Sequence, residues 1–163
     1  MQSEGQSEVE LAPRIVVSVG EQRLRLLEGD EEIASYPVST SKFGPGSEEG
    51  SFRTPLGRFA VDEMIGEGAP EGTIFRSRQR DGRWIPGELA SGEEGDLVLT
   101  RILWLRGLQE ANANTRERYI YIHGTNHEGL IGRPESQGCV RMRNADVRDL
   151  FGRVKQGTRV EIA

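Results

Sequence analysis

The sequence predicts a mostly β fold of the α+β kind, with one helix near the C-terminal end. Three observations support this. Short apolar stretches alternate with polar residues through the first part of the chain, which is the pattern of half-buried strands. Turn signals that contain glycine separate these stretches. Only residues 144–154 carry apolar side chains at helical spacing.

The N-terminal half is predicted to begin as a β-meander. Gly20-Glu21 and Gly29-Asp30 are turn signals between its apolar stretches. A loop rich in glycine and serine follows, and a tight turn at residues 54–57 leads into a further strand. The strands predicted here cover residues 15–19, 24–26, 33–38 and 58–61.

The C-terminal half is predicted to alternate strands with polar connections. Residues 62–96 hold many glycines and charges, which indicates an irregular surface excursion with room for a short hairpin. In the helix, Asn144 is the predicted N-cap and Gly157 lies just beyond the end. Its apolar face comprises Val147, Leu150, Phe151 and Val154, and the flanking strands cover residues 97–105, 119–123 and 159–162.

Composition indicates one domain. We expect residues 1–12 to form a disordered tail or linker, because they offer few apolar groups, and residues 13–163 to form the domain. No stretch approaches the roughly 20 apolar residues of a membrane helix. The net charge of −5 opposes a nucleic-acid partner. The acidic N-terminus lacks the features of a signal peptide, so either the protein is cytoplasmic or a signal or anchor has been removed. No particular oligomeric state is predicted.

The chain has a single cysteine, Cys139, which is either a small buried hydrophobe or a reactive thiol. An apolar strand ends at His123-Gly124, sixteen positions before it. A cysteine attacks as a thiolate, and a nearby imidazolium lowers its pKa. Cys139 as nucleophile and His123 as base therefore predict acyl transfer.

The residues around Cys139 suit the same chemistry. Gly138 lets the backbone come close to a substrate, so the N–H groups of Gly138 and Cys139 are candidate donors to an oxyanion. Arg141 has two candidate roles: it holds a substrate carboxylate, or it ties the pocket wall to backbone carbonyls.

These motifs also carry a resemblance to a known family. The run His123-Gly-Thr, the run Ser136-x-Gly138-Cys139-Val-Arg141 and the helix start at residues 143–146 resemble the L,D-transpeptidase catalytic domain, or YkuD domain. The upstream segments 36–40 and 54–59 fit its earlier landmarks, and residues 100–108 resemble its bacterial envelope subgroup, the ErfK/YbiS-like proteins. The likeness extends over residues 13–162.

The resemblance implies an L,D-transpeptidase-like β-sandwich with the C-terminal helix packed on it. It also implies peptidoglycan stem peptides as substrate, a periplasmic or cell-envelope location, no cofactor, and acylation by carbapenems. In this family the cysteine takes the acyl group from the L-centre carbonyl of a diamino acid, expels a terminal D-alanine and passes the acyl group to an amine.

By motif position, Cys139 is the nucleophile, His123 is the general base, and the carbonyl of Gly124 orients the imidazole. Ser136, Gly138 and Arg141 match positions that shape the pocket. One position departs from the family pattern, because Gln137 stands where a second histidine is usual. We expect Gln137 to tune rate or substrate fit without abolishing activity.

Three alternatives remain at this stage. His123, His127 and Cys139 are zinc-ligand types, but glycine and asparagine between the histidines suit a turn rather than the helix that an i, i+4 zinc pair needs. No metal site is therefore predicted, and His127 is interpreted as a loop residue. Water can replace the amine as acceptor, which would make the protein an L,D-carboxypeptidase or endopeptidase. The pocket can also hold wall peptide without chemistry, as a peptidoglycan-binding module.

Overall fold

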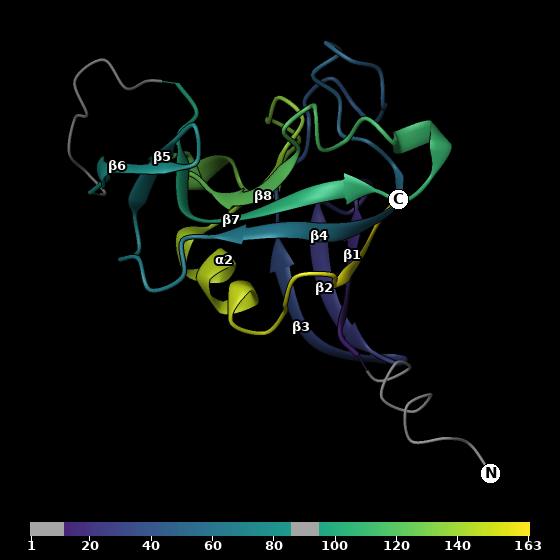
Figure 1. Ribbon diagram of the computed structural model, residues 1–163, viewed down its shortest axis with the longest axis horizontal. Helices are drawn as coiled ribbons and strands as arrows, with labels where there is room; N and C mark the ends of the chain where they lie inside the picture. The colour runs from purple at the N-terminus through teal and green to yellow at the C-terminus, as the bar shows by residue number, and fades with distance from the viewer. Residues whose placement is uncertain (1–11, 86–94) are drawn as a thin grey trace.

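The computed structural model describes residues 12–85 and 95–163, and its fold is mostly β, which confirms the predicted fold class (Figure 1). All of the predicted tail except Ala12 lies outside the described residues, as do residues 86–94 of the predicted excursion. The strands are β1 (Arg14–Ser18), β2 (Arg23–Glu28), β3 (Glu31–Pro37), β4 (Gly57–Ile65), β5 (Thr73–Arg76), β6 (Gln79–Arg83), β7 (Val98–Gly107), β8 (Tyr121–Gly124), β9 (Val140–Met142) and β10 (Arg159–Ile162). The helices are α2 (Asn144–Phe151) and the short 3-10 helices η1 (Glu110–Asn112) and η2 (Glu128–Leu130).

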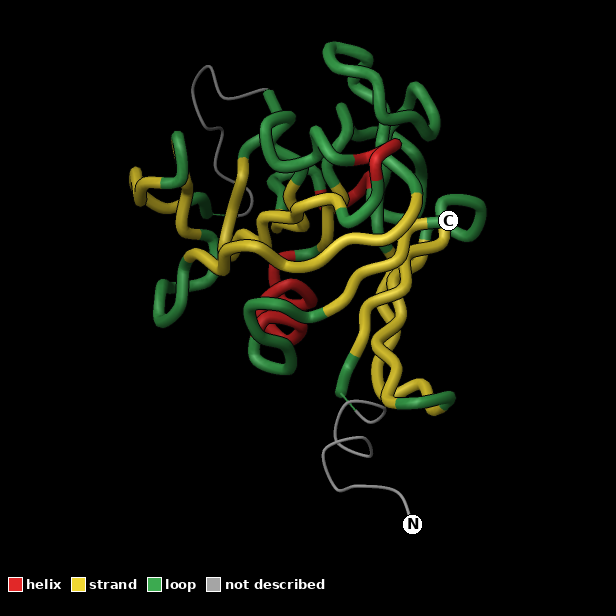
Figure 2. Tube along the Cα trace, turned by 45° about the vertical axis from the view of Figure 1, so that its right-hand side comes forward, coloured by secondary structure: helices red, strands yellow, loops and turns green. Residues whose placement is uncertain are grey.

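The strands form two layers. The strand order is β3-β2-β1-β10-β4-β7-β5-β6, and β8 pairs with both β7 and β9. Side chains of β1 and β2 pack in one core cluster with those of β7, β8, β9 and α2. Elements so distant in the strand order meet only because the sheet folds over itself. Figure 1 shows β1–β3 running across the direction of β4 and β7. Figure 2 shows the helix α2 beside β4 and β7. This is a sandwich with the helix packed on it.

Some elements differ from their predicted bounds. The predicted excursion contains the end of β4 and the β5–β6 hairpin. Strand β8 begins at Tyr121, because Tyr119 has a left-handed φ of 56° and its N–H donates to the Arg116 carbonyl in a turn. Arg143, not Asn144, is the N-cap of α2. Asn144 is buried instead, and its Nδ2 donates to the Thr125 carbonyl at 2.9 Å.

The parallel pair of β8 and β9 positions the residues of interest. In its register Ile122 lies beside Val140 and His123 beside Arg141. Ile122 and Val140 belong to the main core. Because successive side chains of a strand point to opposite faces, His123 and Arg141 share the other face. Cys139 directly precedes β9, and its thiol accepts a bond from the N–H of Tyr121, the first residue of β8.

Candidate active site

The loop that carries Cys139 is fixed from inside the protein. Ser136 is fully buried; its hydroxyl donates to the Cys139 carbonyl at 2.6 Å, and its N–H donates to the Thr40 carbonyl at 2.9 Å. Gly138 has a φ of 124°, a conformation that favours glycine. The Thr54 hydroxyl donates to the Gly138 carbonyl at 2.9 Å. Ser136 and Gly138 thus set the backbone that presents the thiol.

The thiol of Cys139 is partly buried between two backbone groups. Its Sγ donates to the Tyr119 carbonyl at 3.4 Å and accepts from the Tyr121 N–H at 3.3 Å. Burial raises the pKa of the Cys139 thiol to about 12, although the Tyr121 N–H lowers it. The sequence-based expectation of a lowered thiol pKa is therefore not met in this resting arrangement, because desolvation outweighs the groups that favour the thiolate.

His123 is buried and is held by its neighbour in the chain. Its Nδ1 lies 2.6 Å from the Gly124 carbonyl. A carbonyl oxygen only accepts, so Nδ1 carries the proton and Nε2 is left as the basic nitrogen. Burial lowers the pKa of His123, while Asp96 and the Gly124 carbonyl raise it. The imidazole is therefore neutral near pH 7, which is the form that removes a proton.

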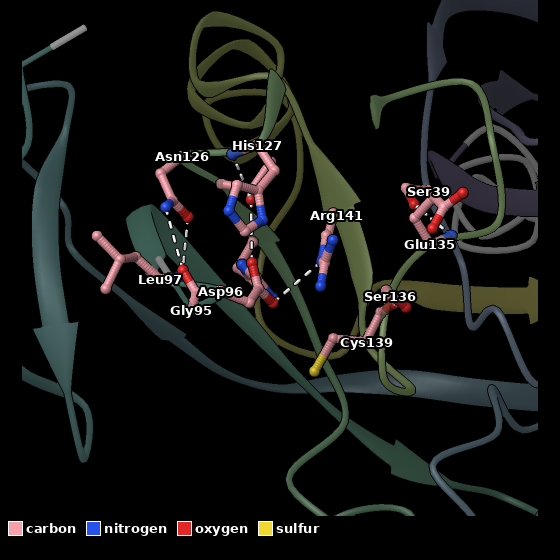
Figure 3. Close-up of polar contacts among 12 residues, drawn as sticks. Ser39, Gly95, Asp96, Leu97, Asn126, His127, Glu135, Ser136, Cys139 and Arg141 are labelled. Carbon is pink, nitrogen blue, oxygen red and sulfur yellow. Dashed lines mark hydrogen bonds and ion pairs between the residues drawn. The ribbon is translucent and has the colours of Figure 1, made fainter. Parts of the chain in front are cut away.

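Arg141 is buried beside His123 in the β8–β9 register. Its side chain is 5% exposed, and its Nε donates to Asp96 Oδ2 at 3.0 Å. Its backbone pairs with Ser39 through N–H and carbonyl, both at 2.9 Å. Figure 3 shows the ion pair of Asp96 with Arg141, and the Cys139 side chain near Arg141. The guanidinium bond goes to the Asp96 carboxylate. Tying the wall through backbone carbonyls and binding a substrate carboxylate both stay predictions for Arg141.

Gly124 has no room for a side chain. A Cβ there would collide with Asn144 Oδ1 and approach the Leu99 carbonyl to 2.8 Å. We predict that Gly124→Ala lowers the free energy of unfolding by about 1–3 kcal/mol, as overpacking does. Thermal denaturation followed by circular dichroism measures this. Gly129→Ala is the control, since nothing lies within 4 Å of its Cβ position. Equal melting temperatures for the two variants would contradict the prediction.

The sequence did not indicate two of the residues at this site. Asp96 is one, and Thr54, interpreted from sequence as turn architecture, is the other. Of the remaining candidates, Gln137 is exposed on the loop, and His127 precedes η2, where its N–H donates to the Thr125 hydroxyl at 3.0 Å.

Within residues 12–85 and 95–163, no group of three or more His, Cys, Asp or Glu side chains is placed to hold a metal ion. In the same residues no helix is long and apolar enough to span a membrane.

Comparison with known proteins identifies the class to which this fold belongs, the L,D-transpeptidase-like domains. More narrowly, the chain belongs to the YkuD family, whose model, described as the L,D-transpeptidase catalytic domain, matches residues 12–162. This confirms the resemblance seen in the sequence.

Relatives and solved structures agree with this assignment. A putative L,D-transpeptidase YkuD of Bacillus licheniformis is 29% identical over 91% of this chain and 64% of its own length. A probable L,D-transpeptidase ErfK/SrfK of Escherichia coli is 31% identical over 91% of this chain and 43% of its own length. The chain thus spans less than two thirds of these relatives. The L,D-transpeptidase of Xylanimonas cellulosilytica shares the fold, with a TM-score of 0.61 and 18% identity over 99% of this chain and 70% of that one.

Proposed function

We propose that this protein is a cysteine-dependent L,D-transpeptidase that acts on peptidoglycan stem peptides through an acyl-enzyme at Cys139. The observation that carries the proposal is that buried His123 lies beside Arg141 in the β8–β9 register, while the thiol of Cys139, two residues before Arg141, bonds the N–H of Tyr121, two residues before His123. Family membership supports the reaction class. Solved relatives include an L,D-transpeptidase in complex with imipenem and one with a faropenem-derived adduct.

Acylation begins with both groups neutral. Nε2 of His123 takes the proton of the Cys139 thiol as Sγ forms a bond to the substrate carbonyl carbon, and the carbonyl electrons move to oxygen. The N–H groups of Gly138 and Cys139 are the proposed oxyanion donors; in the resting site the Gly138 N–H makes only a long bond of 3.3 Å to the Ser136 hydroxyl. The bond to the D-alanine nitrogen then breaks, and the imidazolium returns the proton to that nitrogen.

The second half of the reaction transfers the acyl group. His123 removes a proton from an incoming amine, whose nitrogen attacks the thioester, and the thiol leaves with the proton from the imidazolium. An amine acceptor gives a cross-link or an exchanged terminal residue. Water at the same position gives hydrolysis, which is the carboxypeptidase alternative.

We predict that a tetrapeptide stem ending in D-alanine, incubated with a second stem as acceptor, yields free D-alanine and a joined product. Mass spectrometry of the separated products distinguishes the outcomes. Protein inactivated by alkylation of its single cysteine is the control. A trimmed stem without joined product would reassign the protein as a hydrolase. Binding of the stem with no loss of D-alanine would indicate the non-catalytic wall-binding module.

A further inference from the structure

A carboxylate from outside the sequence motifs reaches the proposed site. Asp96 lies just before β7. Its Oδ2 accepts from Arg141 Nε at 3.0 Å, and its Oδ1 accepts from the Thr125 hydroxyl at 3.0 Å. Thr125 follows His123 by two residues, and Arg141 lies beside His123 in the strand register. The carboxylate therefore lies over the face of the β8–β9 pair that carries His123.

The backbone on both sides of Asp96 is clamped. The Asn126 side chain accepts from the Leu97 N–H at 2.9 Å and donates to the Gly95 carbonyl at 3.1 Å (Figure 3). These two bonds fix the direction of Asp96, whose side chain is 27% exposed. Asp96 thus has bonds on both carboxylate oxygens and a fixed backbone, which indicates a preorganised charge rather than a freely moving surface group.

We propose that Asp96 is a positioning residue of the reaction: its carboxylate holds Arg141 in place beside His123 and compensates the positive charge that His123 takes on when it removes the Cys139 proton. The family's orienting contact, from the Gly124 carbonyl to Nδ1, is a separate one. The inference rests on the proposed function for its turnover readout, whereas its thiol readout is independent of substrate.

The charges around the two reacting groups give the direction of the effect. Asp96 and Arg141 act on His123, where the carboxylate raises the pKa of the imidazole and the guanidinium lowers it. Asp96, Arg141 and Arg118 act on Cys139, where the carboxylate raises the pKa of the thiol and the two arginines lower it. Removing the carboxylate should therefore make the thiol ionise more readily while making His123 a weaker base.

The test is Asp96→Asn, which keeps the shape of the side chain and removes its charge. We expect kcat to fall on the order of tenfold, because a less basic imidazole accepts the Cys139 proton less readily, with KM little changed. The acid limb of the kcat/KM profile should move to lower pH. Alkylation of Cys139 by iodoacetamide, followed against pH, should become faster at mildly alkaline pH. Loss of structure would also expose the thiol and speed its alkylation, so the circular dichroism spectrum and melting temperature of Asp96→Asn must match those of the wild type. The shift of the acid limb is the readout that unfolding does not produce.

Asp149→Asn is the matched control. Asp149 also accepts from a hydroxyl, that of Tyr36 at 2.5 Å, and from an arginine Nε, that of Arg153 at 3.0 Å. The Asp149→Asn variant should leave the pH profiles of kcat/KM and of Cys139 alkylation unchanged. Asp96→Glu should restore part of the turnover. Unchanged pH profiles in Asp96→Asn, or a thiol that becomes less reactive, would overturn the proposal. If the wild-type protein turned over no stem peptide, the alkylation profiles would still decide whether Asp96 acts on Cys139, so the two failures are distinguishable.

Discussion

Cys139→Ala is expected to reduce turnover of stem peptides to background, a loss of at least about 10⁴-fold, as removal of a nucleophile causes in comparable covalent mechanisms. Without Sγ no thioester forms, and no second cysteine replaces it. The fold should survive, because the thiol lies at the edge of a small aromatic cluster and bonds only backbone groups among the described residues. Steady-state release of D-alanine measures the loss.

A carbapenem provides the matching chemical readout. Intact-mass spectrometry of the folded wild-type protein with excess imipenem should show one adduct that maps to the Cys139 peptide. The adduct should be absent from Cys139→Ala and from denatured wild-type protein. Residual turnover in a variant shown by circular dichroism to be folded would exclude Cys139 as the nucleophile.

The fold followed from the sequence where the apolar pattern was strong. A short apolar run predicted β1 and alternation predicted β2. The spacing of Val147, Leu150, Phe151 and Val154 predicted a helix over residues 144–154, and α2 ends earlier, at Phe151 with Gly152 as its C-cap. The β5–β6 hairpin was weakly marked because every residue of β6 is exposed, so its pairing leaves no apolar signature. Strand β9 has three residues, which is too short for a period to emerge.

The candidate site followed only in part. The motif residues Cys139 and His123 were predicted; in the structure His123 lies beside Arg141 in the β8–β9 register, and Cys139 lies two residues before Arg141. Asp96 was missed because its position depends on the pairing of β7 with β8, in which Leu99 lies beside Gly124 after a bulge. The register between two strands is set by long-range packing, so it cannot be predicted from the sequence of either strand alone. A charged residue directly before a strand was the only local signal.

The resting ionisation of the site also lay beyond the sequence. The motif suggested a thiolate beside an imidazolium, but the pKa values depend on how far each group is removed from water. Burial lowers the pKa of His123 and raises the pKa of Cys139, so it favours the neutral form of both groups. This gives His123 a definite role, to accept a proton during the attack rather than to stabilise a charge that already exists.

His123→Ala is therefore expected to lower kcat/KM by about 10²–10⁴-fold, the usual contribution of a general base. The wild-type profile should lose activity as pH falls through the pKa of His123, which burial sets below the usual 6.5, so activity should persist into mildly acidic pH. The variant should lack this acid limb, and its residual rate should rise with pH as the thiol itself ionises. His127→Ala is the control, because His127 is the other histidine of the chain and lies in the loop before η2. A wild-type acid limb that persists unchanged in His123→Ala would show that another group is the base.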